Sequence, residues 1–138
     1  MLYVGLNQVL RQAVPSGVYK TRSRFLPATI RQAVEQRSGR FFYLDGAQVK
    51  DKASFLAAAA QAFEFPDYFG KNWDAFSDCI NDLSWAPSQR YVVLYDQADL
   101  FIETSPDDWD IALEILEEAA QRWQADGVSF HVLMRDHN

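Results

Sequence analysis

Three short apolar segments, separated by helix patterns, restrict the fold of this chain more than any other feature. They are residues 41–44, 91–95 and 128–134, each too short to form a helix of its own. Apolar runs of this length are typical of strands buried on both faces, and such strands pair in parallel beneath crossover helices. Strands that alternate with helices therefore predict a small α/β domain with three parallel strands flanked by helices. The connections between such strands are nearly always right-handed.

The segment before the first of these strands predicts one more strand-helix unit. Residues 2–14 have the spacing of a short amphipathic helix, and residues 27–38 begin with proline and precede glycine, as helices often do. Between them, residues 18–25 alternate in polarity and predict a strand, whose basic face suits a sheet edge: Lys20, Arg22 and Arg24. We therefore expect residues 1–39 to form an extension packed on a main domain of residues 40–138.

Two of the predicted helices have clear start signals. Asp51 is placed to cap a helix with an apolar face, and Ser105 is placed to cap a longer one over residues 105–126. Gly127 follows the longer helix and is expected to end it.

Residues 66–82 combine a loop with an acidic helix. Gly70 is expected to supply an unusual backbone conformation, and Asn72 is a good N-cap. An inward stripe follows at helical spacing: Trp73, Phe76, Cys79, Ile80 and Leu83. Asp74 and Asp78 lie one turn apart on one side of this helix. Two interpretations remain, a solvated helix face or an acidic docking surface preceded by two aromatic side chains, Tyr68 and Phe69.

The same stretch resembles the barstar family of intracellular ribonuclease inhibitors. The matching positions follow the family pattern without a gap: Pro66, Asp67, Tyr68, Phe69, Gly70, Asn72, Asp74, Ala75, Phe76, Asp78 and Cys79. The resemblance continues more weakly from about Phe41 to Met134, and residues 1–39 fall outside it. It implies a barstar-like fold of three parallel strands flanked by helices.

The resemblance also implies a function and a site. In the family, the loop and helix block the active site of a nuclease. Carried over by position, Tyr68 would stack against the nuclease, Asp74 would pair with its basic residues, and Asp78 would occupy a phosphate position. The implied partner-binding set is Tyr68, Phe69, Gly70, Asn72, Trp73, Asp74, Ser77 and Asp78. The implied partner is a basic ribonuclease or a similar secreted nuclease or toxin.

Three positions depart from the family pattern. Ser77 stands where the family has a tryptophan, Lys71 where it has an acid, and Arg122 where it has a contacting glutamate near the end of the last long helix. The departures favour a nuclease other than barnase. They also leave open a non-inhibitory interaction module that retains the fold, with the N-terminal extension as its working part.

Charge and composition narrow the partner class. The net charge is −6, divided between +6 on residues 1–40 and −12 on the remainder. An acidic body attracts basic partners and repels nucleic acid, so we expect no direct nucleic-acid binding. The single cysteine excludes an internal disulfide, and no signal peptide or membrane span is recognisable. We expect a cytoplasmic protein that is monomeric when free.

The sequence does not favour an enzyme, a metal site or a cofactor. Cys79 lies on the apolar side of its helix, with no sign that His131 or His137 comes within reach of it. Asp74 and Asp78 share one helix with no facing cleft, which disfavours acid–base work on sugars. Zinc and calcium spacings, a phosphate loop and a dinucleotide fingerprint are all missing.

A second acidic zone extends from Asp96 to Glu118, and no basic residue occurs between Arg90 and Arg122. It is interpreted as a solvated face with helix-start acids. The alternatives are a second basic partner or a fold-back of the basic residues 1–40.

Overall fold

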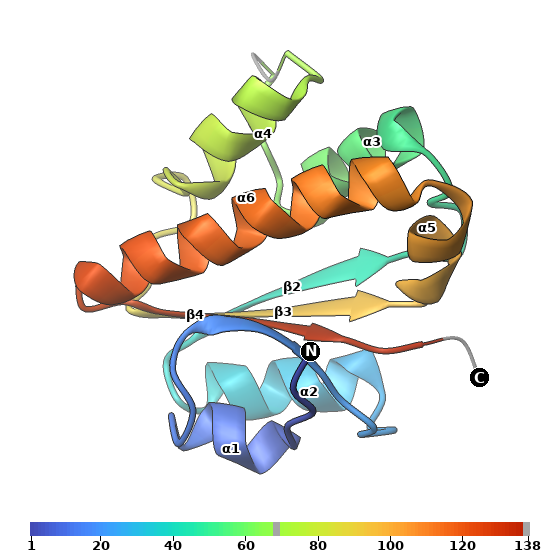
Figure 1. Ribbon diagram of the computed structural model, residues 1–138. Helices are drawn as coiled ribbons and strands as arrows, with labels where there is room; N and C mark the ends of the chain where they lie inside the picture. Colours follow the sequence, from blue (N-terminus) through green and yellow to red (C-terminus); the bar gives the residue numbers. More distant parts are fainter. Residues whose placement is uncertain (68–69, 137–138) are drawn as a thin grey trace.

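Four parallel strands form one sheet, in the order β1-β4-β3-β2, with helices on both faces (Figure 1). The computed structural model describes residues 1–67 and 70–136. The strands are β1 (Gly17–Lys20), β2 (Arg40–Asp45), β3 (Arg90–Asp96) and β4 (Ser129–Met134). The three predicted strands of the main domain and the additional N-terminal strand are confirmed, as is their parallel pairing.

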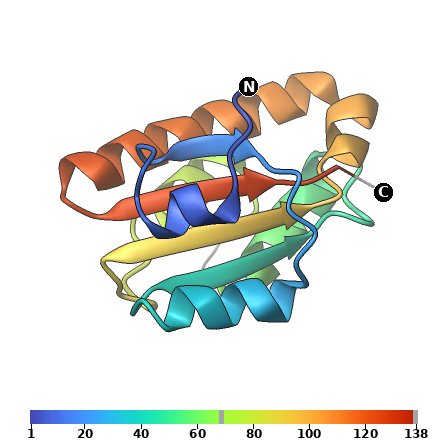
Figure 2. The ribbon, with the colours of Figure 1, turned by 90° about the horizontal axis from the view of Figure 1, so that it is seen from below.

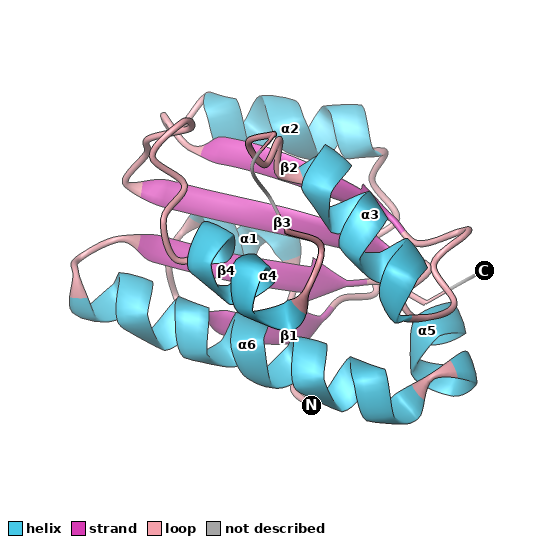
Figure 3. Cartoon of the chain, turned by 90° about the horizontal axis from the view of Figure 1, so that it is seen from above, coloured by secondary structure: helices cyan, strands magenta, loops and turns pink. Residues whose placement is uncertain are grey.

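The helices form two layers of unequal size. Helices α1 (Leu6–Leu10) and α2 (Pro27–Glu35) cover one face, which Figure 2 shows from below. The other face is covered by α3 (Lys52–Ala62), α4 (Trp73–Ile80), α5 (Asp99–Thr104) and α6 (Pro106–Ala125), as Figure 3 shows. The sheet is therefore buried on both sides.

Strand β3 explains why the central runs are continuously apolar. Its side chains alternate between two cores: Val92 and Leu94 join the cluster beneath α1 and α2, whereas Tyr91, Val93 and Tyr95 join the larger cluster beneath the other helices. Because both sheet faces are covered, the five interior positions of the strand, residues 91–95, are all buried.

The N-terminal elements are shorter than predicted. The helix expected over residues 2–14 is confined to Leu6–Leu10, because residues 2–4 run beside β1 instead. Val4 N donates to Lys20 O at 2.9 Å, and Lys20 N donates to Leu2 O at 3.0 Å. The strand expected over residues 18–25 ends at Lys20. Strand β1 does lie at the sheet edge, pairing with β4 alone among the named strands. The division into domains of residues 1–39 and 40–138 stays a prediction.

The helix caps predicted from the sequence are partly confirmed. Asp51 caps α3, since its Oδ1 accepts from Ser54 N at 2.9 Å. Ser105 does not cap α6 through its side chain: its Oγ donates to Lys50 O at 2.8 Å. The short helix α5, which precedes Ser105, was not predicted.

Candidate protein-binding site on helix α4

Helix α4 lies on the outer side of the larger helix layer, above α6 and beside α3 (Figures 1 and 3). Its inward stripe is confirmed, with Phe76, Cys79 and Ile80 all buried. The Phe76 ring packs edge-on against Phe55 of α3, with centroids 5.4 Å apart. The buried stripe fixes which side of the helix faces solvent.

The start of α4 is defined by Asn72, whose Oδ1 accepts from Ala75 N at 2.7 Å. The cap is confirmed. The φ angle of Gly70 depends on Phe69, which lies outside the described residues, so the expectation for Gly70 stays a prediction. Lys71, the next residue, has a left-handed backbone conformation with φ of 55°. A Cβ added at Gly70 would lie 3.3 Å from Asn72 Nδ2, so the absence of a side chain there allows the cap to approach closely.

The solvent side of α4 carries the two predicted carboxylates. Asp74 and Asp78 are both exposed, one turn apart, and Asp82 is exposed just beyond the helix. None of the three forms an ion pair within the part of the chain that the structure describes. Asp74 lies in the first turn, where the helix dipole favours a negative charge. The arrangement is a row of carboxylates available to an external cation.

The remaining predicted contact residues differ in accessibility. Gly70 and Asn72 are exposed, while Tyr68 and Phe69 lie outside the described residues. Trp73 is half-buried, with its ring centroid 5.8 Å from Phe55 and Lys52 Nζ 5.9 Å from its ring. Trp73 therefore packs α4 onto α3 and presents only part of its surface.

Ser77 is also half-buried, and its carbonyl accepts from Asn81 Nδ2 at 2.8 Å. This bond closes the last turn of α4. The Ser77 side chain is small and polar, so it offers a partner much less apolar surface than a tryptophan at this position would.

The end of α4 is fastened to α6 by two neighbouring residues. Trp123 Nε1 donates to Ile80 O at 3.0 Å, and Arg122 Nε donates to Asn81 Oδ1 at 2.7 Å. Arg122 also donates through Nη2 to Asn81 O and through Nη1 to Asp126 Oδ2. Sequence reasoning placed Arg122 at a partner contact and missed this attachment, which no local pattern signals.

Cysteine chemistry is disfavoured by the geometry. Cys79 is buried, and its thiol pKa is raised by burial and, to a smaller extent, by the charges of Asp78 and Asp82. His131 lies on the other side of the sheet, where Nε2 contacts Val14 O at 3.0 Å. A thiolate and a partnering base are therefore not brought together by these two residues.

Two further features bear on the class of site. Within residues 1–67 and 70–136, no three histidine, cysteine or acidic side chains are grouped so that they could hold a metal ion. The helices of the same residues include none with the length and apolar character needed to cross a membrane.

Fold and site together define a small parallel α/β protein that displays an acidic helix on one face. A family model described as Barstar (barnase inhibitor) matches residues 39–135, so the chain belongs to the barstar family. The match begins where the resemblance in the sequence begins, and it leaves α1, β1 and α2 outside as an N-terminal extension.

The comparison with solved structures shows the fold alone. The chain is similar to the Aeropyrum pernix ORC2 protein, solved as ADPNP-ADP complexes, with a TM-score of 0.59 and 15% identity over 96% of this chain. It spans only 38% of the length of that protein. No curated protein matches the chain.

Proposed function

We propose that this protein is an inhibitor or immunity protein that binds a basic ribonuclease, or a similar secreted nuclease or toxin, and occludes its active site. The segment from Tyr68 to Asp78 is the proposed contact. The observation that carries the proposal is the pair of exposed, unpaired carboxylates on α4, Asp74 and Asp78, within the part of the chain that matches the barstar family. In the same proposal the protein acts in the cytoplasm, is monomeric when free, and has no catalytic activity.

Carboxylates suit this role because a ribonuclease binds phosphates with arginine, lysine and histidine side chains. Asp78 is proposed to lie where a phosphate would lie, and Asp74 to pair with neighbouring basic groups, through charge-assisted hydrogen bonds. Removing one such carboxylate leaves a buried cation of the nuclease unpaired, at a cost of about 2–5 kcal/mol.

The way α4 is held supports the same role. Asn72 caps its first turn, and Arg122 and Trp123 hold its last. A helix fixed at both ends loses little conformational freedom on binding, so more of the contact free energy contributes to affinity.

Lys71 favours a target that differs from barnase. It stands exposed directly before the Asn72 cap, and a second lysine, Lys52, lies over the Trp73 ring nearby. A nuclease with a basic residue opposite Lys71 would be repelled there. We therefore infer a basic nuclease whose surface is neutral or acidic at that point.

A second candidate function is a non-inhibitory interaction module. It is favoured by Ser77, which offers little contact surface. It is also favoured by Arg122, which replaces the family's acidic contact residue and bonds to Asn81 within the chain. In this case α4 would be a solvated face, and residues 1–39 would do the binding.

An inhibition titration distinguishes the ribonuclease inhibitor from the non-inhibitory interaction module. The wild type, Asp74→Ala/Asp78→Ala and the control Asp110→Ala/Glu114→Ala are titrated against a panel of basic ribonucleases of the barnase type. The control removes two exposed carboxylates at the same spacing from α6. We expect stoichiometric inhibition by the wild type and the control, and its loss in the α4 variant. Equal inhibition by all three proteins would contradict the site, and no inhibition by the wild type across the panel would favour the second candidate.

A further inference from the structure

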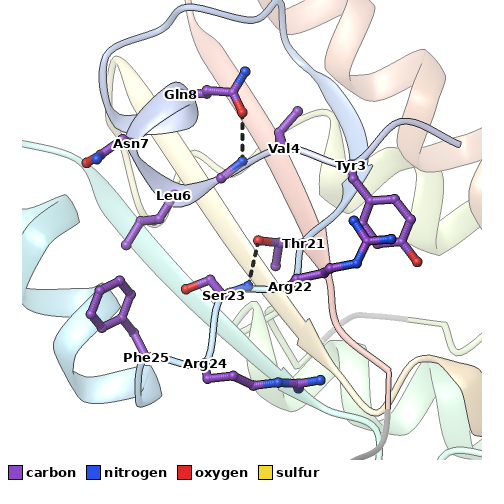
Figure 4. Close-up of a pocket in the computed structure, with 11 residues that line it drawn as sticks. Tyr3, Val4, Leu6, Asn7, Gln8, Thr21, Arg22, Ser23, Arg24 and Phe25 are labelled. Carbon is purple, nitrogen blue, oxygen red and sulfur yellow. Dashed lines mark hydrogen bonds between the residues drawn. The ribbon is translucent and has the colours of Figure 1, made fainter.

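The N-terminal extension forms a groove of about 850 Å³ that lies outside the family match. Its two walls are residues 3–8, which pass beside β1 and enter α1, and residues 21–25, which follow β1 (Figure 4). The groove belongs to the α1 and α2 side of the molecule, whereas α4 lies in the opposite helix layer (Figures 1 and 2). A ligand in the groove would therefore leave the acidic helix accessible.

Both walls are held by hydrogen bonds within the chain. Arg135, at the end of β4, donates through Nη1 to Ser23 O at 3.1 Å and to Phe25 O at 2.7 Å. Gln8 Oε1 accepts from Gly5 N at 2.8 Å on the other wall. These bonds keep the loop after β1 apart from residues 3–8, so the groove is formed before any ligand arrives.

Two exposed apolar side chains, Tyr3 and Phe25, line this groove, and others lie next to them in the sequence. The described residues leave six large apolar side chains exposed, and all but Ile111 belong to residues 1–3 and 25–26. Phe25 is 55% exposed and Leu26 70%. A concentration of apolar surface on a protein with an otherwise polar exterior is typical of an interaction site. Leu6 lies within the groove, facing Phe25 from the opposite wall in Figure 4.

The rim of the groove is basic. Arg22 and Arg24 are exposed, and neither forms an ion pair with another described residue. The Arg22 guanidinium lies 3.7 Å from the centroid of the Tyr3 ring, which orients it along the rim. In the groove wall, the Ser23 hydroxyl oxygen is itself buried and has no hydrogen-bond partner among the described residues.

We propose that this groove binds an acidic peptide segment of a partner protein. An apolar side chain of the peptide would lie between Leu6 and Phe25, and its carboxylates would pair with Arg22 and Arg24. A nucleic acid fits less well, because Arg22 already covers one face of the Tyr3 ring, which leaves Phe25 as the one exposed aromatic ring of the described groove lining with no such cover. The net charge of −6 also opposes a long polyanion.

The test uses the full chain and labelled probes in a fluorescence anisotropy titration. The first probe is a peptide with a central Leu-Phe between two runs of glutamate. The second replaces glutamate by lysine, and the third replaces Leu-Phe by Ser-Ser. A single-stranded oligouridine of similar length is the fourth. We expect saturable binding of the first probe, and binding of the other three weaker by about tenfold or more, since both charge and apolar contacts are required.

Variants then locate the binding. Arg22→Ala/Arg24→Ala and Phe25→Ser should each weaken binding of the first peptide about tenfold or more. Arg11→Ala/Arg37→Ala removes two exposed arginines outside the groove and should leave the affinity for the first peptide unchanged. Asp74→Ala/Asp78→Ala should leave that affinity unchanged as well. No saturable binding of the first peptide would overturn the proposal, and so would tighter binding of oligouridine or an equal loss in the two arginine variants. The outcome is independent of ribonuclease inhibition, because α4 is not part of the groove.

Discussion

Arg122 of α6 holds both oxygens of Asn81, the residue at which α4 ends. Its Nη2 donates to the main-chain oxygen and its Nε to Oδ1, while Trp123 donates to Ile80 O one residue earlier. A cation at the C-terminus of a helix is also favoured by the helix dipole. The orientation of the carboxylates on α4 thus depends on a side chain forty residues further along the chain.

Replacing Arg122 by alanine should destabilise the protein by about 1 kcal/mol. The value lies below the usual range of about 1.5–3 kcal/mol for bonds to a charged group, because the Arg122 side chain is 47% exposed and solvent screens its charge. Arg122→Lys should restore only part of the loss, since an ammonium cannot donate to both Asn81 oxygens in the planar arrangement of a guanidinium. Urea unfolding measures the effect, with Gln121→Ala as an exposed neighbouring control. A midpoint for Arg122→Ala equal to that of the control would show that the attachment is not significant.

Arg135 should matter far more for stability than the other ion-paired arginines. It pairs with Asp96 through two bonds of 2.7 and 2.8 Å, and the two side chains are only 7% and 17% exposed. Arg135→Ala leaves a largely buried carboxylate without its cation, which we expect to cost about 3–5 kcal/mol. The matched control is Arg40→Ala, whose partner Glu64 and own side chain are well exposed, with an expected cost of about 0–1 kcal/mol.

The stability that the Asp96–Arg135 pair contributes should depend on pH. Burial by itself raises the pKa of Asp96, but hydrogen bonds from Arg135 and Tyr43 outweigh it, so the pKa is lowered overall. The pKa of Tyr43 is in turn raised to about 12 by burial and by its bond to Asp96. Because the folded pKa of Asp96 is below the unfolded one, its contribution is present above about pH 4 and is lost as the pH falls further. The loss in free energy of unfolding caused by Arg135→Ala should therefore become smaller in acid. A loss that stays constant from pH 7 to pH 3 would contradict this account.

His131 should make the protein less stable just below neutral pH. Its pKa is lowered, chiefly by burial, although its contacts with the Val14 and Pro15 carbonyls act in the opposite direction. The unfolded chain then binds the proton near pH 6.5 while the folded chain does not, so stability falls as the pH drops below about 6.5. Unfolding midpoints of the wild type and His131→Gln at pH 8 and pH 5.5 measure the effect. The difference between the two pH values should be smaller in His131→Gln.

The parts of the fold that follow from local pattern could be predicted from sequence. Strands β2, β3 and β4 are apolar because both sheet faces are covered. Helices α3 and α4 have caps, Asp51 and Asn72, whose side-chain oxygens accept from backbone N–H groups in the first turn of the same helix. The exposure of Asp74 and Asp78 follows from the same helical spacing. For the caps and the helix face the deciding contact lies within a few residues, and for the strands the continuous apolar run is itself a local signal.

What could not be predicted depends on distant contacts. Residues 21–25 belong to the predicted strand, yet the carbonyls of Ser23 and Phe25 accept from the Arg135 side chain instead of continuing the strand. Ser105 has the features of a cap, yet its hydroxyl donates to Lys50 O in another segment. Asp96, expected in a solvated acidic zone, is instead paired with Arg135. Each of these partners is more than thirty residues away, beyond the reach of any spacing rule.

Asp78→Ala should separate binding from folding. Since Asp78 is exposed and unpaired, its loss should change the free energy of unfolding by less than about 0.5 kcal/mol, and relief of repulsion from Asp74 could make the change slightly stabilising. Binding to an inhibited ribonuclease should weaken by about 2–5 kcal/mol, because a cation in the nuclease would be left buried and unpaired. Calorimetric titration against that nuclease, with Asp110→Ala of α6 as control, measures the second effect. Loss of binding together with a large loss of stability would mean that Asp78 supports the fold, and unchanged affinity would place the contact elsewhere.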